Sequence, residues 1–373
     1  MGFNVGNLYV GGQKTIVIAE AGVNHLKRTD YAEQLIKTAK DAGVDIIKFQ
    51  TYDAKKLTTK DAPRFWNWEG ERVEAGSQYD SYDVLATPER DFTQKLISIC
   101  DKYDIEFMST PFDLDSVNML NEIGCKAFKI ASGDITNFPL LREVAKIGKP
   151  VFLSSGASDI LDIKLAISEL TKIKPNLDIC IMHCNLCYPS RPEDANLSAV
   201  MDIKSHFPNY EIGLSDHTIG PLIPAASCLL GVKAIEKHYT FDNSLPDSAD
   251  HWLSINSIGM SKMVNMLRTL EKAYGNELKG VNKSEERARA NARRSMVARG
   301  KINKGEKFTS ENIIMKRPGS GISPIYYDEI IGLTASRDLN DDQIIMPTDI
   351  IEDASFKPIT PDLIGESIPS HED

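Results

Sequence analysis

Short apolar segments recur along the first two thirds of the chain, each followed by a stretch with helical spacing of apolar residues. The segments are four to six residues long and rich in Val, Ile and Phe, which is typical of buried strands. Most of them end 23 to 30 residues apart, and the eight predicted ends are Glu20, Gln50, Ser109, Ile130, Ser154, His183, Ser215 and His238. Eight strand–helix units in succession predict an α/β fold, a closed (β/α)8 (TIM) barrel.

One step in this series is longer than the rest. The second and third predicted strands end 59 residues apart, so residues 53–87 form an insertion that is rich in aromatic side chains: Trp66, Trp68, Tyr79 and Tyr82. Loops that follow barrel strands surround the active face. We therefore expect the insertion to cover a bound substrate.

Two local predictions concern the N-terminal segment. A hairpin is expected around Gly11 and Gly12, because glycine tolerates the backbone angles of tight turns. A helix is expected over residues 30–42, with Asp30 as its N-cap.

Charge and hydropathy exclude some classes of function. The formal net charge of −10 argues against a broad nucleic-acid surface, which requires clustered Lys and Arg. No apolar run reaches the roughly 18 residues that span a bilayer, so no membrane segment is expected. The N-terminal residues lack the apolar core of a signal peptide, which predicts a cytoplasmic protein.

His217 and His238 lie at the ends of two consecutive predicted strands. Parallel strands joined by a crossover end on the same side of a barrel, so the two imidazoles can converge although 21 positions separate them. Two converging histidines can hold one divalent metal ion. The alternative is that each is a core or surface histidine satisfied by a neighbour.

Lys48 and Lys129 occur inside otherwise apolar strands. An unpaired ammonium is costly to bury, so each lysine requires an anionic partner, and a phosphorylated or carboxylated ligand could supply it. The hydroxyls of Thr110, Ser132 and Ser154 could donate the remaining hydrogen bonds. The alternative for each hydroxyl alone is a strand-end hydrogen bond to the backbone.

The composition of the sequence changes after the predicted barrel. Residues 1–278 are predicted to form the barrel with its N-terminal hairpin, and residues 279–292 are charged and poor in large apolar side chains, as in a linker or solvated helix. Short strands and turns over residues 293–352 predict a small, mostly β domain. Residues 353–373 are predicted to be an acidic, loose tail.

Nine ordered motifs carry a family resemblance that covers residues 3–351: IAEAGVNH, DIIKFQTY, EFMSTPFD, KIASGDITNFPLL, SSGAS, GLSDHT, EKHYT, RRSMVARGKINKGE and KRPGSG. In this order they resemble the sialic acid (nonulosonic acid) synthases, and the last domain resembles the antifreeze-like (SAF) module of that family. The resemblance implies a transferase that condenses phosphoenolpyruvate with an N-acylated mannosamine-type sugar and releases phosphate. It also implies a divalent metal, Mn or Mg, as cofactor.

Motif by motif, the resemblance also implies roles for individual residues. His217 and His238 correspond to the metal ligands, Glu20 and Gln50 to residues near the sugar and its aldehyde, and Asp250 to a residue that contacts the sugar hydroxyls. Arg317 corresponds to an arginine that one subunit of a homodimer supplies to the site of the other. The positions that surround phosphoenolpyruvate are Lys48, Thr110, Lys129, Ser132, Ser154, Tyr188 and Ser215.

The sequence departs from the family pattern at two places. Leu186 stands where the family usually has Asn or Ser two positions before the Tyr of its YP motif, so either Asn185 takes over that contact or the contact is absent. The segment PDSADHW replaces the usual PGPDH around Asp250 and leaves the acceptor sugar open. It could be N-acetylmannosamine, a 2,4-diacetamido-6-deoxymannose used in a legionaminic-acid-type synthesis, or a phosphorylated form.

Two other classes remain as alternatives. A metal-dependent barrel hydrolase also uses strand-end histidines, but it commonly has more His and Asp ligands and has no evident use for two buried lysines. A non-catalytic glycan-binding or ice-binding protein is suggested by the last domain alone. The polar residues at the strand ends favour the synthase.

Overall fold

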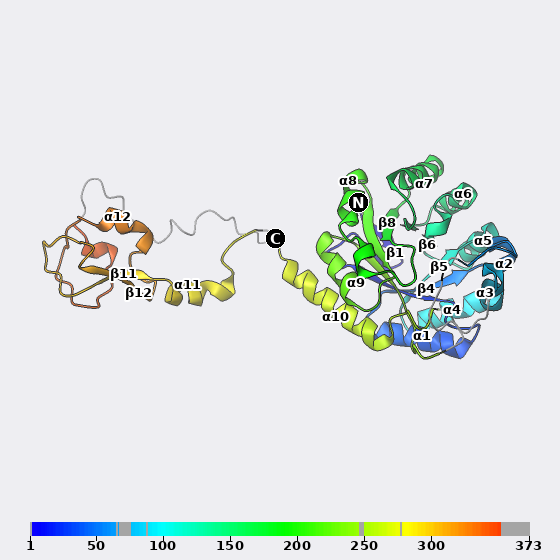
Figure 1. Ribbon diagram of the computed structural model, residues 1–373, viewed down its shortest axis with the longest axis horizontal. Helices are drawn as coiled ribbons and strands as arrows, with labels where there is room; N and C mark the ends of the chain where they lie inside the picture. Colours follow the sequence, from blue (N-terminus) through cyan, green and yellow to red (C-terminus); the bar gives the residue numbers. More distant parts are fainter. Residues whose placement is uncertain are drawn as a thin grey trace. The chain divides into compact units, whose positions relative to one another are not determined.

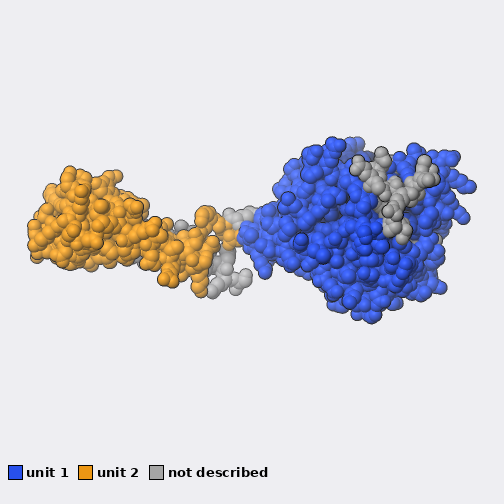
Figure 2. All heavy atoms as spheres, turned by 60° about the horizontal axis from the view of Figure 1, so that its bottom comes forward, with its two compact units in different colours: residues 1–275 blue, residues 276–373 orange. Residues whose placement is uncertain are grey.

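The computed structural model describes residues 2–64, 66, 76–86, 89–245, 250–276 and 278–351. The chain divides into two compact units, residues 1–275 and 276–373, which are coloured separately in Figure 2. Trp68 and the predicted tail lie outside the described residues. Among the described residues, no helix is both long enough and apolar enough to cross a membrane.

The first unit is a closed barrel of eight parallel strands in the order β10-β3-β4-β5-β6-β7-β8-β9, which confirms the predicted fold class. Figure 1 shows helices around the strands. The strands are β3 (Ile16–Gly22), β4 (Ile46–Thr51), β5 (Glu106–Pro111), β6 (Phe128–Ile130), β7 (Val151–Ser154), β8 (Ile179–Cys184), β9 (Glu211–Asp216) and β10 (Ala234–His238). The helices that alternate with them are α1 (Thr29–Asp41), α4 (Arg90–Lys102), α5 (Leu114–Glu122), α6 (Phe138–Ile147), α7 (Ile160–Ile173), α8 (Ala199–His206), α9 (Leu222–Ala226) and α10 (Ser257–Tyr274).

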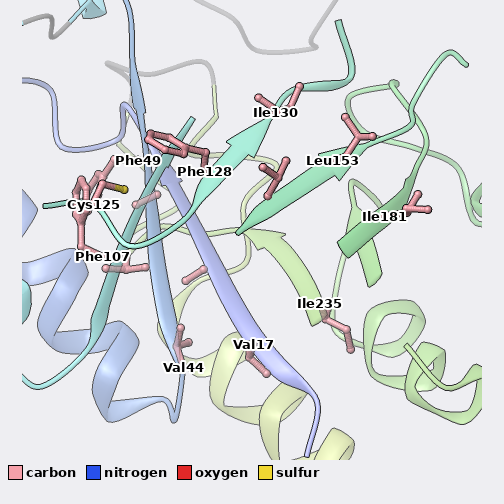
Figure 3. Packing of buried hydrophobic residues seen from close by; sticks show 14 of the residues in the cluster. Val17, Val44, Phe49, Phe107, Cys125, Phe128, Ile130, Leu153, Ile181 and Ile235 are labelled. Atoms are coloured by element: carbon pink, nitrogen blue, oxygen red, sulfur yellow. The ribbon is translucent and has the colours of Figure 1, made fainter. Parts of the chain in front are cut away.

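The helices bury one apolar face against the outer side of the strands. In α1 this face is formed by Ala32, Leu35, Ile36 and Ala39, with the spacing of an amphipathic helix. Outward-facing strand residues such as Val17, Ile181 and Ile235 complete the layer, as Figure 3 shows. This shell holds the strand ends in place.

The N-terminal hairpin packs inside the barrel, and its turn differs from the prediction. Strands β1 (Phe3–Val5) and β2 (Leu8–Val10) pair with Val5 opposite Leu8, so the turn lies at Gly6 and its neighbour rather than at Gly11 and Gly12. Gly6 has φ +56, which suits a tight two-residue turn. The Phe3 and Phe152 ring centroids lie 6.0 Å apart, so the hairpin joins the inner apolar cluster of the barrel.

The predicted N-cap of the first helix is also wrong. Helix α1 begins at Thr29, and Arg28 occupies the N-cap position without a side-chain cap. Asp30 lies in the first turn, where its carboxylate faces the positive end of the helix dipole and accepts hydrogen bonds from the Arg28 guanidinium.

The insertion after β4 contains α2 (Ala54–Leu57) and α3 (Gln78–Leu85). Tyr52, Ala54, Tyr82 and Phe112 pack there in a separate apolar cluster that includes Val23. Because Val23 and Tyr52 immediately follow β3 and β4, this cluster lies at the carboxyl ends of these strands.

The second unit is small and contains little regular structure. Its helix α11 (Glu286–Ala292) has no buried side chain, in keeping with the predicted solvated segment. Strands β11 (Ser295–Ala298) and β12 (Ile313–Lys316) pair antiparallel, and α12 (Tyr327–Ile330) follows. Its core is formed by Met296, Ala298, Ile302, Phe308, Ile313, Ile322, Ile330, Ala335, Leu339, Ile345 and Ile350.

Candidate active site

The inner face of the barrel changes from apolar to polar along each strand. Side chains alternate between the two faces of a strand, so residues two positions apart share the inner face. In β3 this series is Ile16, Ile18 and Glu20, and in β10 it begins with Ala234 and continues through Glu236 to His238. The apolar members fill the amino-terminal half of the barrel, and the polar members gather at the carboxyl end.

The two strand lysines are bound to carboxylates of the protein itself. Lys48 Nζ forms an ion pair with Glu20 Oε2 and lies 3.8 Å from Glu236 Oε1, while Lys129 Nζ lies 3.0 Å from the same Glu236 oxygen. Ser215 Oγ donates to this oxygen at 3.2 Å. Each lysine thus has the anionic partner that the sequence analysis required, but the fold rather than a ligand supplies it, because both ammonium groups are buried before a ligand arrives.

The two carboxylates of this network, Glu236 and Glu20, differ in the direction of their pKa shifts. Burial favours the protonated form of Glu236, but Lys129 and Lys48 outweigh it and hold the pKa of Glu236 at about 2. Burial raises the pKa of Glu20, and the attraction of Lys48 offsets this only in part. Glu20 is therefore the carboxylate of the network that accepts a proton more readily.

The histidine pair lies beside the lysines. The rings of His217 and His238 have centroids 5.3 Å apart, and the Tyr188 ring contacts both, at 4.1 and 5.6 Å. The Asn185 carbonyl oxygen accepts from His217 Nδ1 at 2.6 Å, which leaves Nε2 of His217 as the nitrogen with a free lone pair. Burial and the charges of His217 and Lys48 lower the pKa of His238 well below its usual value, which keeps that ring neutral.

This donor set fits an exchangeable metal ion. Neutral imidazole is the form that binds metal, and a carbonyl bound to the second ring nitrogen fixes the tautomer that such a ligand requires. The described residues contain no group of three or more His, Cys, Asp and Glu side chains that could hold a metal. Two histidines would then bind the ion, with the remaining positions open to oxygen ligands from outside the protein.

The residues predicted to meet the sugar contact one another and His238. Gln50 Nε2 donates to Glu20 Oε1 at 3.0 Å, and Asp250 Oδ2 lies 3.6 Å from His238 Nδ1. Burial and the neighbouring Glu20 carboxylate raise the pKa of Asp250 to about 7. The structure thus brings Glu20, Gln50, His238 and Asp250 into one group.

The three predicted hydroxyls differ in their hydrogen bonds. Lys48 Nζ donates to Thr110 Oγ1 at 3.0 Å, and Ser132 Oγ accepts from the Gly156 backbone N–H at 3.0 Å. Ser154 Oγ is buried and has no hydrogen-bond partner among the described residues. A buried hydroxyl without a partner is rare in folded proteins, so Ser154 is the member of this set most clearly prepared for a ligand.

Two predicted residues stand apart from this group. The Asn185 side chain donates to the Asp194 carbonyl and accepts from Ser190 within its own loop, so its contact with the site runs through the backbone carbonyl on His217. Arg317 directly follows β12 in the second unit and has an exposed side chain.

Sequence reasoning gave Glu236 no role. Its signal was present, because Glu236 lies two residues before His238 on the same strand and must share its inner face. Cys184 was also missed: its Sγ lies 3.9 Å from His217 Nδ1. No sequence signal marks this cysteine, since the contact depends on the crossing from β8 to β9.

Comparison with known proteins agrees with this geometry. The NeuB family model matches residues 35–279, and the SAF domain model matches residues 293–351. The chain is 37% identical to the N,N'-diacetyllegionaminic acid synthase of Campylobacter jejuni, over 89% of this chain and 99% of that protein. It is 32% identical to the N-acetylneuraminate-9-phosphate synthase of Mus musculus, over 83% of this chain and 85% of that protein.

A solved structure gives the same result. The N-acetylneuraminic acid synthetase of Leptospira borgpetersenii, in complex with citrate, is 34% identical and superposes with a TM-score of 0.67. The alignment covers 77% of this chain and 95% of that one. The chain therefore belongs to the NeuB family and carries a C-terminal SAF domain.

Proposed function

We propose that the protein is a nonulosonic acid synthase that condenses phosphoenolpyruvate with N-acetylmannosamine or a related 2-acetamido sugar and releases phosphate. The observation that carries the proposal is the buried pair Lys48 and Lys129, bridged by Glu236 next to two histidines. Two ammonium groups with surrounding hydroxyls suit the phosphate and carboxylate of phosphoenolpyruvate. The family membership supports the same reaction.

In the proposed complex, Lys48, Lys129, Thr110, Ser132, Ser154, Tyr188 and Ser215 surround phosphoenolpyruvate. Entry of an anion redistributes the ammonium hydrogen bonds, which Glu236 and Glu20 hold in the free protein. Because the lysines are already fixed by these carboxylates, little side-chain freedom is lost when the anion binds. Such preorganisation holds the reacting carbon in line with the aldehyde.

The sugar would lie on the side of Glu20, Gln50 and Asp250. C3 of phosphoenolpyruvate attacks the aldehyde carbon, water adds at C2, and the tetrahedral intermediate breaks its C2–O bond to expel phosphate. The added water loses one proton as the former aldehyde oxygen gains one, and the C2 hydroxyl loses its remaining proton to the departing phosphate as C2 becomes a keto carbon. Glu20 is our candidate for this transfer, because burial raises its pKa.

We propose Mn or Mg as the cofactor, held by His217 and His238. When bound, a divalent ion polarises the aldehyde oxygen and makes its carbon more electrophilic. The protein's own contribution is to present Nε2 of His217 and a ring nitrogen of the neutral His238, with the Asn185 carbonyl fixing the tautomer of His217.

We further propose that the protein is a homodimer in which Arg317 serves the site of the partner subunit. The resemblance of KRPGSG to the family motif and the exposed side chain of Arg317 support this assignment. A planar guanidinium suits the acyl oxygen or carboxylate of the substrates better than an ammonium group would.

A legionaminic-acid-type synthase with a 2,4-diacetamido-6-deoxymannose acceptor is the second candidate. The likeness to the Campylobacter jejuni protein favours it. The metal-dependent hydrolase is disfavoured, since the described residues lack the larger ligand cluster that such enzymes commonly use.

Incubation with phosphoenolpyruvate, Mn and each candidate sugar tests the proposal. We expect phosphate release that requires both substrates, together with a product whose mass equals the sugar plus the pyruvate unit. Phosphate release that needs no sugar, or hydrolysis of the sugar alone, would contradict the synthase.

A further inference from the structure

Lys237 and Asp216 form a buried ion pair directly behind the two histidines of the site. They are register partners on the adjacent strands β10 and β9, and His238 and His217 are the residues that follow them. Lys237 Nζ lies 2.6 Å from Asp216 Oδ2, and the two side chains are 1% and 3% exposed. Because side chains alternate along a strand, the ion pair lies on the outer face of the barrel and the histidines lie on the inner face.

Stability does not explain why an ion pair occupies this position. Ile235 lies on the same outer face of β10, two residues earlier, and belongs to the apolar layer between strands and helices (Figure 3). Replacing a buried ion pair by apolar side chains of similar volume is often neutral or stabilising. An apolar pair at positions 216 and 237 would hold the two strands together equally well, so the ion pair points to a role other than stability.

The same two side chains also hold the backbone next to His217. Thr218 Oγ1 donates to the Asp216 carboxylate at 2.9–3.0 Å, and the Thr218 backbone N–H donates to Asp216 Oδ1 at 3.3 Å. Lys237 Nζ donates to the Thr218 carbonyl oxygen as well as to Asp216. From the neighbouring loop, the Ser190 backbone N–H donates to the His217 carbonyl oxygen at 2.9 Å. The peptide groups on both sides of Thr218 are therefore hydrogen-bonded.

One side chain thus connects the backbone of one histidine to the backbone of the other. Lys237 is the residue before His238, and its ammonium group contacts the two residues that flank His217. The ring centroids of the two histidines are 5.3 Å apart. Groups that bind one ion together must be held within about 0.5 Å of the productive geometry, so a shift of either strand end would impair the pair.

We infer that Lys237, Asp216 and Thr218 are positioning residues, which set the separation of the His217 and His238 rings from behind the strands. The inference rests on the proposed metal site. None of the three side chains has to touch the metal ion or a substrate. The alternative is a purely structural ion pair that joins β9 to β10.

The test measures the Kd of Mn from the electron paramagnetic resonance signal of free Mn, with saturating phosphoenolpyruvate, no sugar, and a protein-free reference. Lys237→Met should raise this Kd about 10- to 100-fold, the range for loss of a group that orients a metal ligand. Ile235→Ala is the matched control, because Ile235 is buried on the same face of the same strand and makes apolar contacts only. It should lower Tm and leave the Kd of Mn unchanged.

Further variants separate positioning from stability. Lys237→Met/Asp216→Asn buries no unpaired charge, so it should recover most of the Tm that Lys237→Met loses, while the Kd of Mn stays raised. This double variant also carries the test if Lys237→Met fails to fold. Thr218→Val removes the hydroxyl that contacts Asp216 and should raise the Kd, whereas Thr218→Ser keeps the hydroxyl and should bind Mn as the unsubstituted protein does.

Three outcomes would contradict the inference. An unchanged Kd of Mn in the double variant and in Thr218→Val overturns it and leaves the proposed metal site intact. An equal rise in Kd in Ile235→Ala also overturns it, because the effect would then follow from lost stability. Absence of Mn binding by the unsubstituted protein refutes the metal site, and the inference with it, while phosphate release tests the synthase reaction separately.

Discussion

Lys129→Met separates the structural role of this lysine from its role in binding phosphoenolpyruvate. Lys129 and Glu236 are both 5% exposed and lie 3.0 Å apart. At an effective dielectric of about 20, this distance corresponds to an attraction of about 5.5 kcal/mol. Lys48, at 3.8 Å, retains about 4.4 kcal/mol of attraction for Glu236 after the change.

The net effect on stability is smaller than these attractions, because the variant no longer buries an ammonium group. Breaking a buried ion pair costs about 3–5 kcal/mol of stability. Because Glu236 keeps its contacts with Lys48 and Ser215, we expect Lys129→Met to lose about 3 kcal/mol, the lower end of this range. Thermal unfolding should show Tm lower by about 6–12 °C for a domain of this size.

Binding of phosphoenolpyruvate should weaken separately. One charge-assisted hydrogen bond contributes about 1.5–3 kcal/mol, which corresponds to about 10- to 150-fold in Kd by calorimetric titration. The double variant Lys129→Met/Glu236→Gln should recover most of the stability, because no carboxylate is left without its partner, but none of the affinity.

Lys237→Met is the matched control. Lys237 is 1% exposed and ion-paired with Asp216 at 2.6 Å, but strand alternation places it on the outer face of β10. The Lys237→Met variant should lose stability and retain its affinity for phosphoenolpyruvate. An unchanged Kd in Lys129→Met, alongside a lowered Tm, would refute the assignment of Lys129 to the anion.

Three further predictions concern the metal, acid stability and subunit sharing. Chelation should abolish turnover and Mn or Mg should restore it, because His217 and His238 form a sparse site without thiolate ligands; full activity in protein shown to be metal-free by elemental analysis would contradict this. His25 is buried with its pKa lowered to about 3, so the unfolded state binds an additional proton at this residue below pH 6.5. Its contribution to the unfolding free energy should fall by about 1.6 kcal/mol between pH 6.5 and 5, and the fall measured in denaturant titrations should be smaller by this amount in the His25→Phe variant. Mixing Arg317→Ala with His238→Ala subunits should restore activity, because one composite site of the mixed dimer then has both residues; no recovery, with mixed dimers confirmed by native mass spectrometry, would place Arg317 elsewhere.

The barrel and the polar end of its inner face follow from local sequence. A strand repeats every two residues, so Lys48 with Gln50, Ser215 with His217, and Glu236 with His238 must each share a face. Parallel connections then bring all strand ends to one side. For this reason the strand-end side chains could be predicted without coordinates.

Local sequence was a weaker guide to turn positions and helix starts, because several residue types can adopt the same backbone conformation. Two neighbouring glycines predicted a turn at Gly11 and Gly12, but strand pairing selected Gly6. Asp30 has the side chain of an N-cap, yet the helix begins at Thr29 and Asp30 lies in its first turn. Both outcomes depend on packing and pairing across the segment rather than on one residue's preference.

Only the tertiary structure decided which charges meet. Glu236 and Lys129 are 107 positions apart, and neither strand specifies which carboxylate will face that lysine. Closure of the barrel fixes the distances across its interior, and with them the partners of Lys48 and Lys129. The sequence by itself thus determined which kinds of residue lie at the active face. The pairing of the charged side chains was decided only when the barrel closed, because burying an unpaired charge is costly.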